Sequence, residues 1–289
     1  MLNKEDKDFL AKKGISEKQI EEQLASFEKG FPYLRLAAAA SVDNKGIMSV
    51  DNEMRKKYLN AWDTYKDTDK VVLKFVPASG AASRMFKNLF EFLNADYMEP
   101  VTEFEKKFFN HIRDFAFYDE LNAACINNVG KDVEALLKEH CYKEIVANLL
   151  KSEGLNYGAL PKGLLKFHRY VDEVRTPFEE HLVEGALYAA GKSGKVNVHF
   201  TVSPEHRYLF QKLMNEKVGK YADKFHVEYN ITFSEQKTST DTIAVDVENK
   251  PFRNEDGSLL FRPGGHGALI ENLNDLDADI IFIKNIDNV

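Results

Sequence analysis

A stretch of small residues followed by an arginine is the first part of the sequence that could do chemistry. It follows an apolar run, and its members are Ala78, Ser79, Gly80, Ala81, Ala82 and Ser83. Small side chains let backbone N–H groups approach an anion closely, and Arg84 adds a permanent charge whose planar fork matches phosphate oxygens. The stretch therefore suits phosphate binding, while a tight strand-to-helix turn with a surface arginine would have the same composition.

Three further segments carry groups that a phosphate ligand would need. Lys162 lies in a loop with proline and glycine, where its ammonium is a point charge. Gly264 and Gly265 belong to a glycine-rich loop on which a planar base could dock through main-chain contacts. Asp287 follows an apolar run and would offer Mg²⁺ a hard oxygen ligand at the carboxyl end of a strand. A solvated loop lysine, a sharp turn and a strand-end cap are the corresponding structural alternatives.

The periodicity of apolar residues predicts the scaffold that must position these segments. The valine-rich run 71–76 predicts a buried strand directly before the small-residue loop, and alternation at 196–200 and 227–233 predicts two more strands. A capping box at Ser16 and an N-cap at Thr176 mark helix starts. Strands that alternate with helices predict an α/β fold with a mixed, mostly parallel sheet flanked by helices.

The chain is expected to divide into three parts. Residues 99–152 have apolar residues at helical spacing and no strand signal, so they predict an inserted helical subdomain. Residues 71–98 and 153–289 would then form the α/β domain, and residues 1–70 would form an N-terminal helical segment packed on its core.

Composition excludes several classes of protein. The formal net charge of −7 argues against a general nucleic-acid binder or a membrane-surface binder, because both need a basic footprint. The two cysteines form no C-x-x-C pattern and predict reduced thiols. The N-terminus has no apolar signal region, and no run reaches the ~18 apolar residues of a membrane span. A cytoplasmic location is therefore predicted.

Taken in order, these segments resemble the sugar-1-phosphate nucleotidylyltransferase superfamily, which has a glycosyltransferase-A-like fold, and within it the UDP-sugar pyrophosphorylases. The residues that carry the resemblance are the loop ending in Ser83-Arg84-Met85, Pro161-Lys162-Gly163-Leu164-Leu165, Thr176-Pro177-Phe178-Glu179, Gly264-Gly265-His266-Gly267 and Ile286-Asp287-Asn288. The resemblance covers about residue 71 to the C-terminus. This sequence departs from it at Ser79 and Ala82, where glycine is usual, and in the long separation of Arg84 from Lys162.

The resemblance implies a nucleotidylyltransferase that binds a nucleoside triphosphate, here UTP, and a sugar phosphate, and that releases pyrophosphate. It implies that Arg84 holds the β- and γ-phosphates, that Lys162 lies near the α-phosphate and that Asp287 binds Mg²⁺. The base would be received by Gly264, Gly265 and Gln236. Because the sequence ends two residues after Asp287, the family's acceptor-binding half is expected to be missing. A non-catalytic, degenerate sugar-nucleotide-binding domain is the alternative.

Overall fold

The protein forms two compact units in a computed structural model that describes residues 2–42 and 46–289. One unit comprises Met1–Lys70 and Glu235–Asp277, and the other comprises Val71–Ser234 and Ala278–Val289. This division differs from the expected one, because Glu235–Asp277 folds with the N-terminal segment and not with the sheet.

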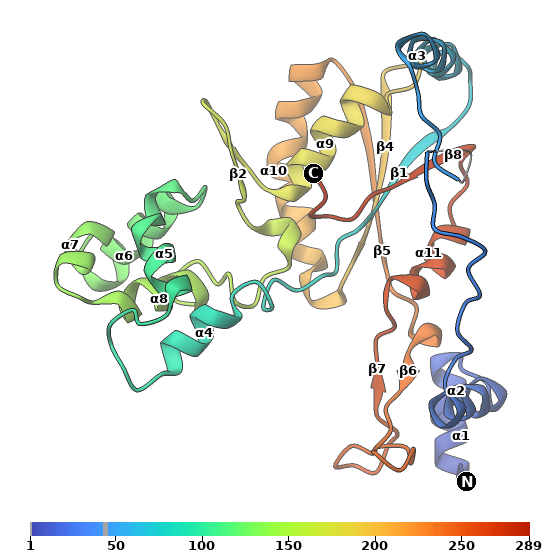
Figure 1. The fold of residues 1–289 in the computed structure, drawn as a ribbon, viewed down its shortest axis with the longest axis horizontal. Helices are drawn as coiled ribbons and strands as arrows, with labels where there is room; N and C mark the ends of the chain where they lie inside the picture. Colours follow the sequence, from blue (N-terminus) through green and yellow to red (C-terminus); the bar gives the residue numbers. More distant parts are fainter. Residues whose placement is uncertain (1, 43–45) are drawn as a thin grey trace. The chain divides into compact units, whose positions relative to one another are not determined.

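The two segments of the first unit, blue and orange to red in Figure 1, fold together because they share an apolar cluster. The helices and strands of this unit are α1 (Lys4–Lys13), α2 (Glu17–Lys29), α3 (Asn52–Lys66), β6 (Thr242–Ile243), β7 (Phe261–Arg262) and α11 (Ile270–Asn274). Leu10, Ile15 and Ile20 are buried in one cluster with Ile243 and Leu259 of the later segment. The first unit therefore has an apolar core of its own.

The second unit is built on a four-stranded parallel sheet with the order β5-β4-β1-β8. Its strands are β1 (Val72–Pro77), β4 (Lys195–Val202), β5 (Glu228–Glu235) and β8 (Ile280–Ile283). All residues of the central strand β1 are buried, and Phe75 pairs with His199 on one side and with Ile283 on the other. The predicted α/β fold with a mostly parallel sheet is thereby confirmed, and the run 71–76 is its central strand.

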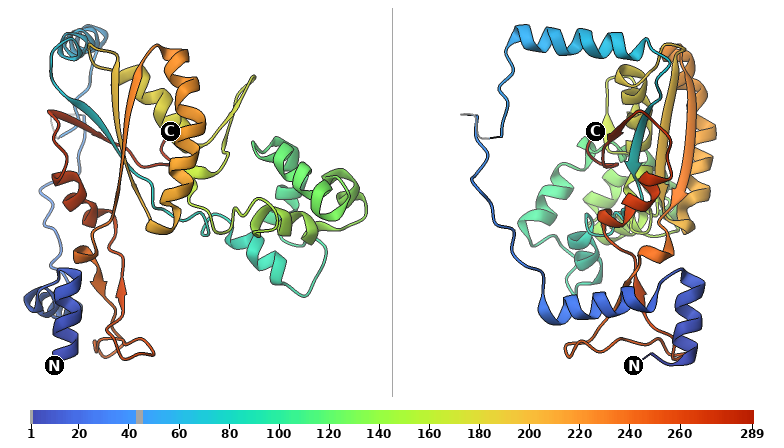
Figure 2. Two further views of the ribbon diagram at one scale, coloured as in Figure 1. Left: turned by 180° about the vertical axis from the view of Figure 1, so that it is seen from behind. Right: turned by 90° about the vertical axis from the view of Figure 1, so that its right-hand side faces the viewer.

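Two helices, α9 (Pro177–Tyr188) and α10 (Arg207–Phe225), pack on this sheet (Figure 2). Phe178 on α9 stacks on Phe200 of β4 with ring centroids 4.6 Å apart. A Cβ at Gly185 would lie 2.8 Å from Cγ1 of Val196, so glycine lets α9 approach the sheet closely. Among the described residues, no helix is long and apolar enough to cross a membrane.

A group of short helices separates β1 from α9 in the sequence. It consists of α4 (Lys87–Asn94), α5 (Glu103–Asn110), α6 (Tyr118–Val129), α7 (Val133–Lys138) and α8 (Tyr142–Leu150). Their apolar faces enclose a separate core that includes Phe92, Phe109, Leu121 and Leu149. The predicted helical insertion is confirmed, and its core extends beyond residues 99–152 because Phe86 also belongs to it. A short ribbon of β2 (His168–Arg169) and β3 (Val174–Arg175) then leads into α9.

A buried lysine at the centre of the sheet belongs to a cluster of three charged side chains, and the other two members are partly exposed. Lys74 on β1 is fully buried, and its Nζ lies 2.6 Å from Oε2 of Glu184. The other oxygen of Glu184 lies 2.5 Å from Nζ of Lys284. Burial lowers the pKa of Lys74 from its ordinary 10.5 to about 8, against the opposing effect of Glu184. Glu184 is therefore the main partner that keeps the buried ammonium charged.

Two substitutions in this cluster should have opposite effects on stability. Glu184→Gln should lower the free energy of unfolding by about 3–5 kcal/mol, because it leaves the Lys74 cation buried without a partner. Lys74→Met should be neutral or stabilising by about 1–4 kcal/mol, because it removes the cost of burying a cation while Glu184 keeps Lys284. Urea denaturation at neutral pH measures both effects.

The difference in the free energy of unfolding between Lys74→Met and the wild type should also depend on pH. The folded-state pKa of Lys74, about 8, lies below its ordinary 10.5, so the unfolded chain binds more protons between these values. The contribution of Lys74 to stability therefore rises with pH across that window. The advantage of Lys74→Met should be full below pH 8 and shrink towards pH ~10.4. A difference that stays constant over this range would contradict the assignment.

Candidate functional site

The candidate site lies at the carboxyl end of the sheet, where the strand order reverses. From β1 the chain goes to β4 and β5 on one side, and it later returns to β8 on the other side of β1. Open parallel sheets bind ligands at such a point, because the two loops diverge there and leave a crevice. The N–H of Ile286 donates to the carbonyl of Pro77 over 3.1 Å, so the pairing of β8 with β1 continues beyond the strand. The small-residue loop and Asp287 therefore leave the sheet at the same edge.

The loop after β1 exposes backbone amides. Ala78 and Ala82 are buried, and their N–H groups donate to the carbonyls of Thr201 over 2.8 Å and of Leu160 over 3.3 Å. Within the described part of the chain, the N–H groups of three exposed residues between them have no acceptor: Ser79, Gly80 and Ala81. Successive free amides in a loop of small residues form a surface that can bind an anion.

A short antiparallel bridge joins this loop to the loop that carries Lys162. The N–H of Lys162 donates to the carbonyl of Gly80 over 3.1 Å, and Ala81 lies opposite Pro161. The helices α4–α8 lie between these two segments in the sequence. The insertion therefore begins and ends at the candidate site, which brings Lys162 to the loop despite its long separation from Arg84 in the sequence.

Lys162 makes an ion pair with Asp287, in which Nζ lies 2.5 Å from Oδ2. Both side chains are partly exposed, so solvent and ligands can reach the pair. The next residue, Gly163, is buried in the turn η2 (Lys162–Leu164). A Cβ at Gly163 would lie 2.8 Å from the ring of Phe210 and 3.0 Å from Cγ1 of Ile286. Glycine thus lets the turn fit closely against the segment that carries Asp287.

Asp287 suits a metal ion that is shared with a ligand. Across residues 2–42 and 46–289, no group of three or more His, Cys, Asp or Glu side chains could hold a metal ion. Mg²⁺ bound with a nucleotide needs only one or two protein carboxylates, because phosphate oxygens and waters complete its shell. The donor set here fits that kind of site and does not fit a metal cage made by protein alone.

Arg84 lies at the other end of the loop, and its side chain is exposed. It lines a groove of about 630 Å³ together with Ser83, Lys87, Phe90, Glu91 and Asn94. Among the described residues, Arg84 has neither a hydrogen-bond partner nor an ion-pair partner. Its guanidinium is therefore open to a ligand, whereas the ammonium of Lys162 is already paired.

The predicted base-binding residues lie in the first compact unit, where two of them bind one another. In the amide orientation that satisfies both partners, Gln236 donates to the carbonyl of Gly264 over 3.1 Å and accepts from its N–H over 2.8 Å. A Cβ at Gly264 would lie 2.8 Å from Cβ of Ala268 and 2.9 Å from the carbonyl oxygen of Thr240, so local packing requires glycine. Gly265 has no heavy atom within 4 Å of a Cβ position, and its carbonyl accepts a hydrogen bond from the N–H of Ala268 over 2.9 Å.

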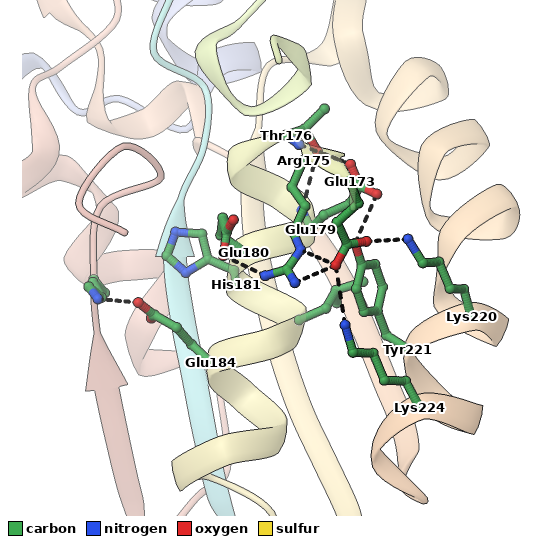
Figure 3. A network of polar contacts seen from close by, with 12 residues as sticks. Glu173, Arg175, Thr176, Glu179, Glu180, His181, Glu184, Lys220, Tyr221 and Lys224 are labelled. Atoms are coloured by element: carbon green, nitrogen blue, oxygen red, sulfur yellow. Dashed lines mark hydrogen bonds and ion pairs between the residues drawn. The ribbon is translucent and has the colours of Figure 1, made fainter. Parts of the chain in front are cut away.

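Helix α9 carries buried and partly buried ionisable side chains that the sequence analysis did not identify (Figure 3). The predicted N-cap at Thr176 is confirmed, and Thr176 forms a capping box with Glu179. Beyond it, Glu180 and His181 are buried and Glu184 is partly buried. Ionisable residues within an apolar helix, and Lys74 within a valine-rich strand, are the sequence signals that could have identified them. Charged groups at positions predicted to be buried need partners, so they indicate ion pairs or hydrogen bonds inside the fold.

An ion network ties the β2–β3 ribbon to α10 (Figure 3). Glu173 accepts hydrogen bonds from Arg175, Lys220 and Lys224. Burial disfavours its charge, but these three cations outweigh that effect and lower the pKa of Glu173 to about 2. The guanidinium of Arg175 also lies 4.3 Å from the ring centroid of Tyr170. The connection from the Lys162 loop to α9 is thereby held in place.

A parallel sheet with free amides, a lysine and a carboxylate at its switch point places this protein in the class of open α/β proteins, which commonly bind ligands beyond the carboxyl ends of their strands. Within that class, the chain belongs to a family described as a domain of unknown function, DUF4301, whose family model matches residues 3–289. No curated protein and no solved structure matches it.

Gly163→Ala should lower the free energy of unfolding by about 1–3 kcal/mol, because the new methyl group would overlap the ring of Phe210. Gly219→Ala is the matched control. It lies within α10 with nothing inside 4 Å of its Cβ position, so it should stabilise the helix by about 0.5–1 kcal/mol. Thermal denaturation of both variants measures the two shifts. Shifts of the same sign would show that the close fit at Gly163 has been misjudged.

Proposed function

We propose that this chain is a nucleotidylyltransferase-like protein that binds a nucleoside triphosphate, with UTP as the expected one, and a sugar phosphate, and releases pyrophosphate. The observation that supports this most is the antiparallel bridge that joins Gly80 and Ala81 of the small-residue loop to Pro161 and Lys162. It lies beside Asp287 at the switch point of the sheet. These are the groups to which the resemblance to sugar-1-phosphate nucleotidylyltransferases assigns the phosphates and Mg²⁺.

The proposed reaction depends on positioning and on neutralising charge. An oxygen of the sugar phosphate would attack the α-phosphorus in line, and the bond from that phosphorus to the oxygen bridging to the β-phosphate would break. Pyrophosphate leaves with that oxygen. The free amides from Ser79 to Ala81, together with Arg84, would hold the β- and γ-phosphates. Lys162 would contact the α-phosphate, where negative charge develops.

The pair between Lys162 and Asp287 gives the free protein a neutral resting site. Asp287 would hold Mg²⁺ together with phosphate oxygens, and the bound ion supplies further charge neutralisation. For this to occur, Lys162 must leave Asp287 and move to a phosphate. The complex of Mg²⁺ with a nucleotide would supply a phosphate for Lys162 and the metal ion for Asp287 at the same time. Mg²⁺ and the nucleotide should therefore bind together far better than either binds alone.

A non-catalytic sugar-nucleotide-binding domain is the second candidate. Gln236 and Gly264 already satisfy each other's hydrogen bonds, so a base could use them only by breaking that pair. Ala82 stands where the sugar-1-phosphate nucleotidylyltransferases usually have glycine, but this difference does not favour a non-catalytic domain. Ala82 is fully buried, and its methyl group therefore belongs to the core and does not narrow the loop.

Alanine at Arg84 or Lys162, or asparagine at Asp287, should weaken binding of Mg·UTP by about 10- to 100-fold. The reason is that a hydrogen bond to a charged group contributes ~1.5–3 kcal/mol. Titration calorimetry on the whole chain measures the affinities. Lys166→Ala is the matched control, because this lysine follows in the same loop but pairs with Glu120 of the insertion. Its affinity should equal that of the wild type.

Release of pyrophosphate from UTP with a panel of sugar 1-phosphates distinguishes the two candidates. Release by the wild type that is lost in Lys162→Ala supports the transferase. Binding without release supports the non-catalytic domain. Equal affinity of all four variants and the wild type would reject the assigned phosphate site under either candidate.

A further inference from the structure

His181 on α9 contacts the peptide group that links Ile286 to Asp287. Its side chain is fully buried, and Nε2 lies 3.2 Å from the carbonyl oxygen of Ile286. Because a carbonyl oxygen only accepts hydrogen bonds, Nε2 must carry the proton. The N–H of Ile286 is bound to Pro77 of β1. The residue before Asp287 is therefore held from two sides, by the central strand and by α9.

The other ring nitrogen of His181 gives the fold no stabilising contact. Nδ1 is buried, and it has no hydrogen-bond partner within the described chain. With the proton on Nε2, Nδ1 is an acceptor, and folded proteins leave few buried acceptors unpaired. Burial, and next the charge of Lys74, lower the pKa of His181 to about 3, so the ring is neutral near pH 7. The ring therefore serves the Ile286 carbonyl through Nε2 while its own Nδ1 stays unsatisfied.

The surroundings fix the ring in this place. Nζ of Lys74 lies 3.4 Å from the carbonyl oxygen of His181, which anchors its backbone to β1. The imidazole packs edge-on against Phe200, with ring centroids 6.2 Å apart. A buried ring that is anchored on both sides has little freedom to leave the Ile286 carbonyl.

We infer that His181 is a positioning residue, which fixes the Ile286–Asp287 peptide through its Nε2–H and so sets where the carboxylate of Asp287 meets Lys162 and an incoming ligand. The part of this inference that concerns the ligand rests on the proposed function. The part that concerns the peptide rests on the hydrogen bonds of Ile286 alone.

His199 offers a matched control in the same sheet. It is also buried, and its two ring nitrogens lie 2.8 Å from the hydroxyls of Thr232 and Ser234. It stacks on Phe75 and makes these contacts to β5, so its loss should not release the segment after β8. Any general effect of removing a buried histidine from this sheet will appear in His199→Leu as well.

The experiment compares whole-chain wild type with His181→Leu, His181→Gln and His199→Leu by hydrogen exchange of residues 284–289. Exchange should be about tenfold faster in His181→Leu, because the local opening of this segment becomes easier. His181→Gln should match the wild type, since its amide can donate to the same carbonyl. The affinity for Mg·UTP should follow the same order, about tenfold weaker in His181→Leu and rescued in His181→Gln. His181→Asn, whose amide is too short to reach, replaces the leucine variant if that variant does not fold.

Two results would overturn the inference, whatever the ligand is. One is unchanged exchange of residues 284–289 in His181→Leu, and the other is equal acceleration in His199→Leu. Faster exchange in His181→Leu alone supports the positioning role even if the wild type binds no nucleotide. In that case the proposed function fails and the positioning role stands.

Discussion

The parallel pairing of β1 with β8 is the contact on which the candidate site depends. It joins a strand from the start of the second unit to a strand that returns only after the whole of Glu235–Asp277. Parallel neighbours cannot be joined by a tight turn, so each must be brought in by a long connection. Because the pairing runs on to Ile286, the loop after β1 and the carboxylate of Asp287 emerge together. A β8 paired elsewhere would leave Lys162 without its partner.

Two kinds of ion pair serve different purposes in the second unit. Glu184 neutralises Lys74 in the interior, where an unpaired charge is very costly, so this contact has to persist in the folded state. The pair between Lys162 and Asp287 is partly exposed, and exposed pairs contribute little to stability. Such a pair can be exchanged for contacts to a ligand at small cost. Burial thus separates the charges that maintain the fold from those that are available to a ligand.

Local signals in the sequence were sufficient for most of the secondary structure. The strand at 71–76, the capping box at Ser16 and the N-cap at Thr176 each depend on residues within a few positions of one another. The α/β class was equally accessible, because alternation of strand and helix patterns is visible along the chain.

The sequence by itself thus determined most of the elements, the fold class and the small-residue loop with its neighbouring cations. Only the tertiary structure decided which of these groups meet. It joined Lys162 to Gly80 by a backbone hydrogen bond and to Asp287 by an ion pair. It also paired Gln236 with Gly264 in the first unit, and it brought the ring of His181 to the carbonyl of Ile286. Periodicity and capping report contacts between near neighbours, whereas these contacts join residues far apart in sequence. Such contacts are selected by burial, close packing at Gly163 and hydrogen-bond satisfaction, which exist only once the strands have paired.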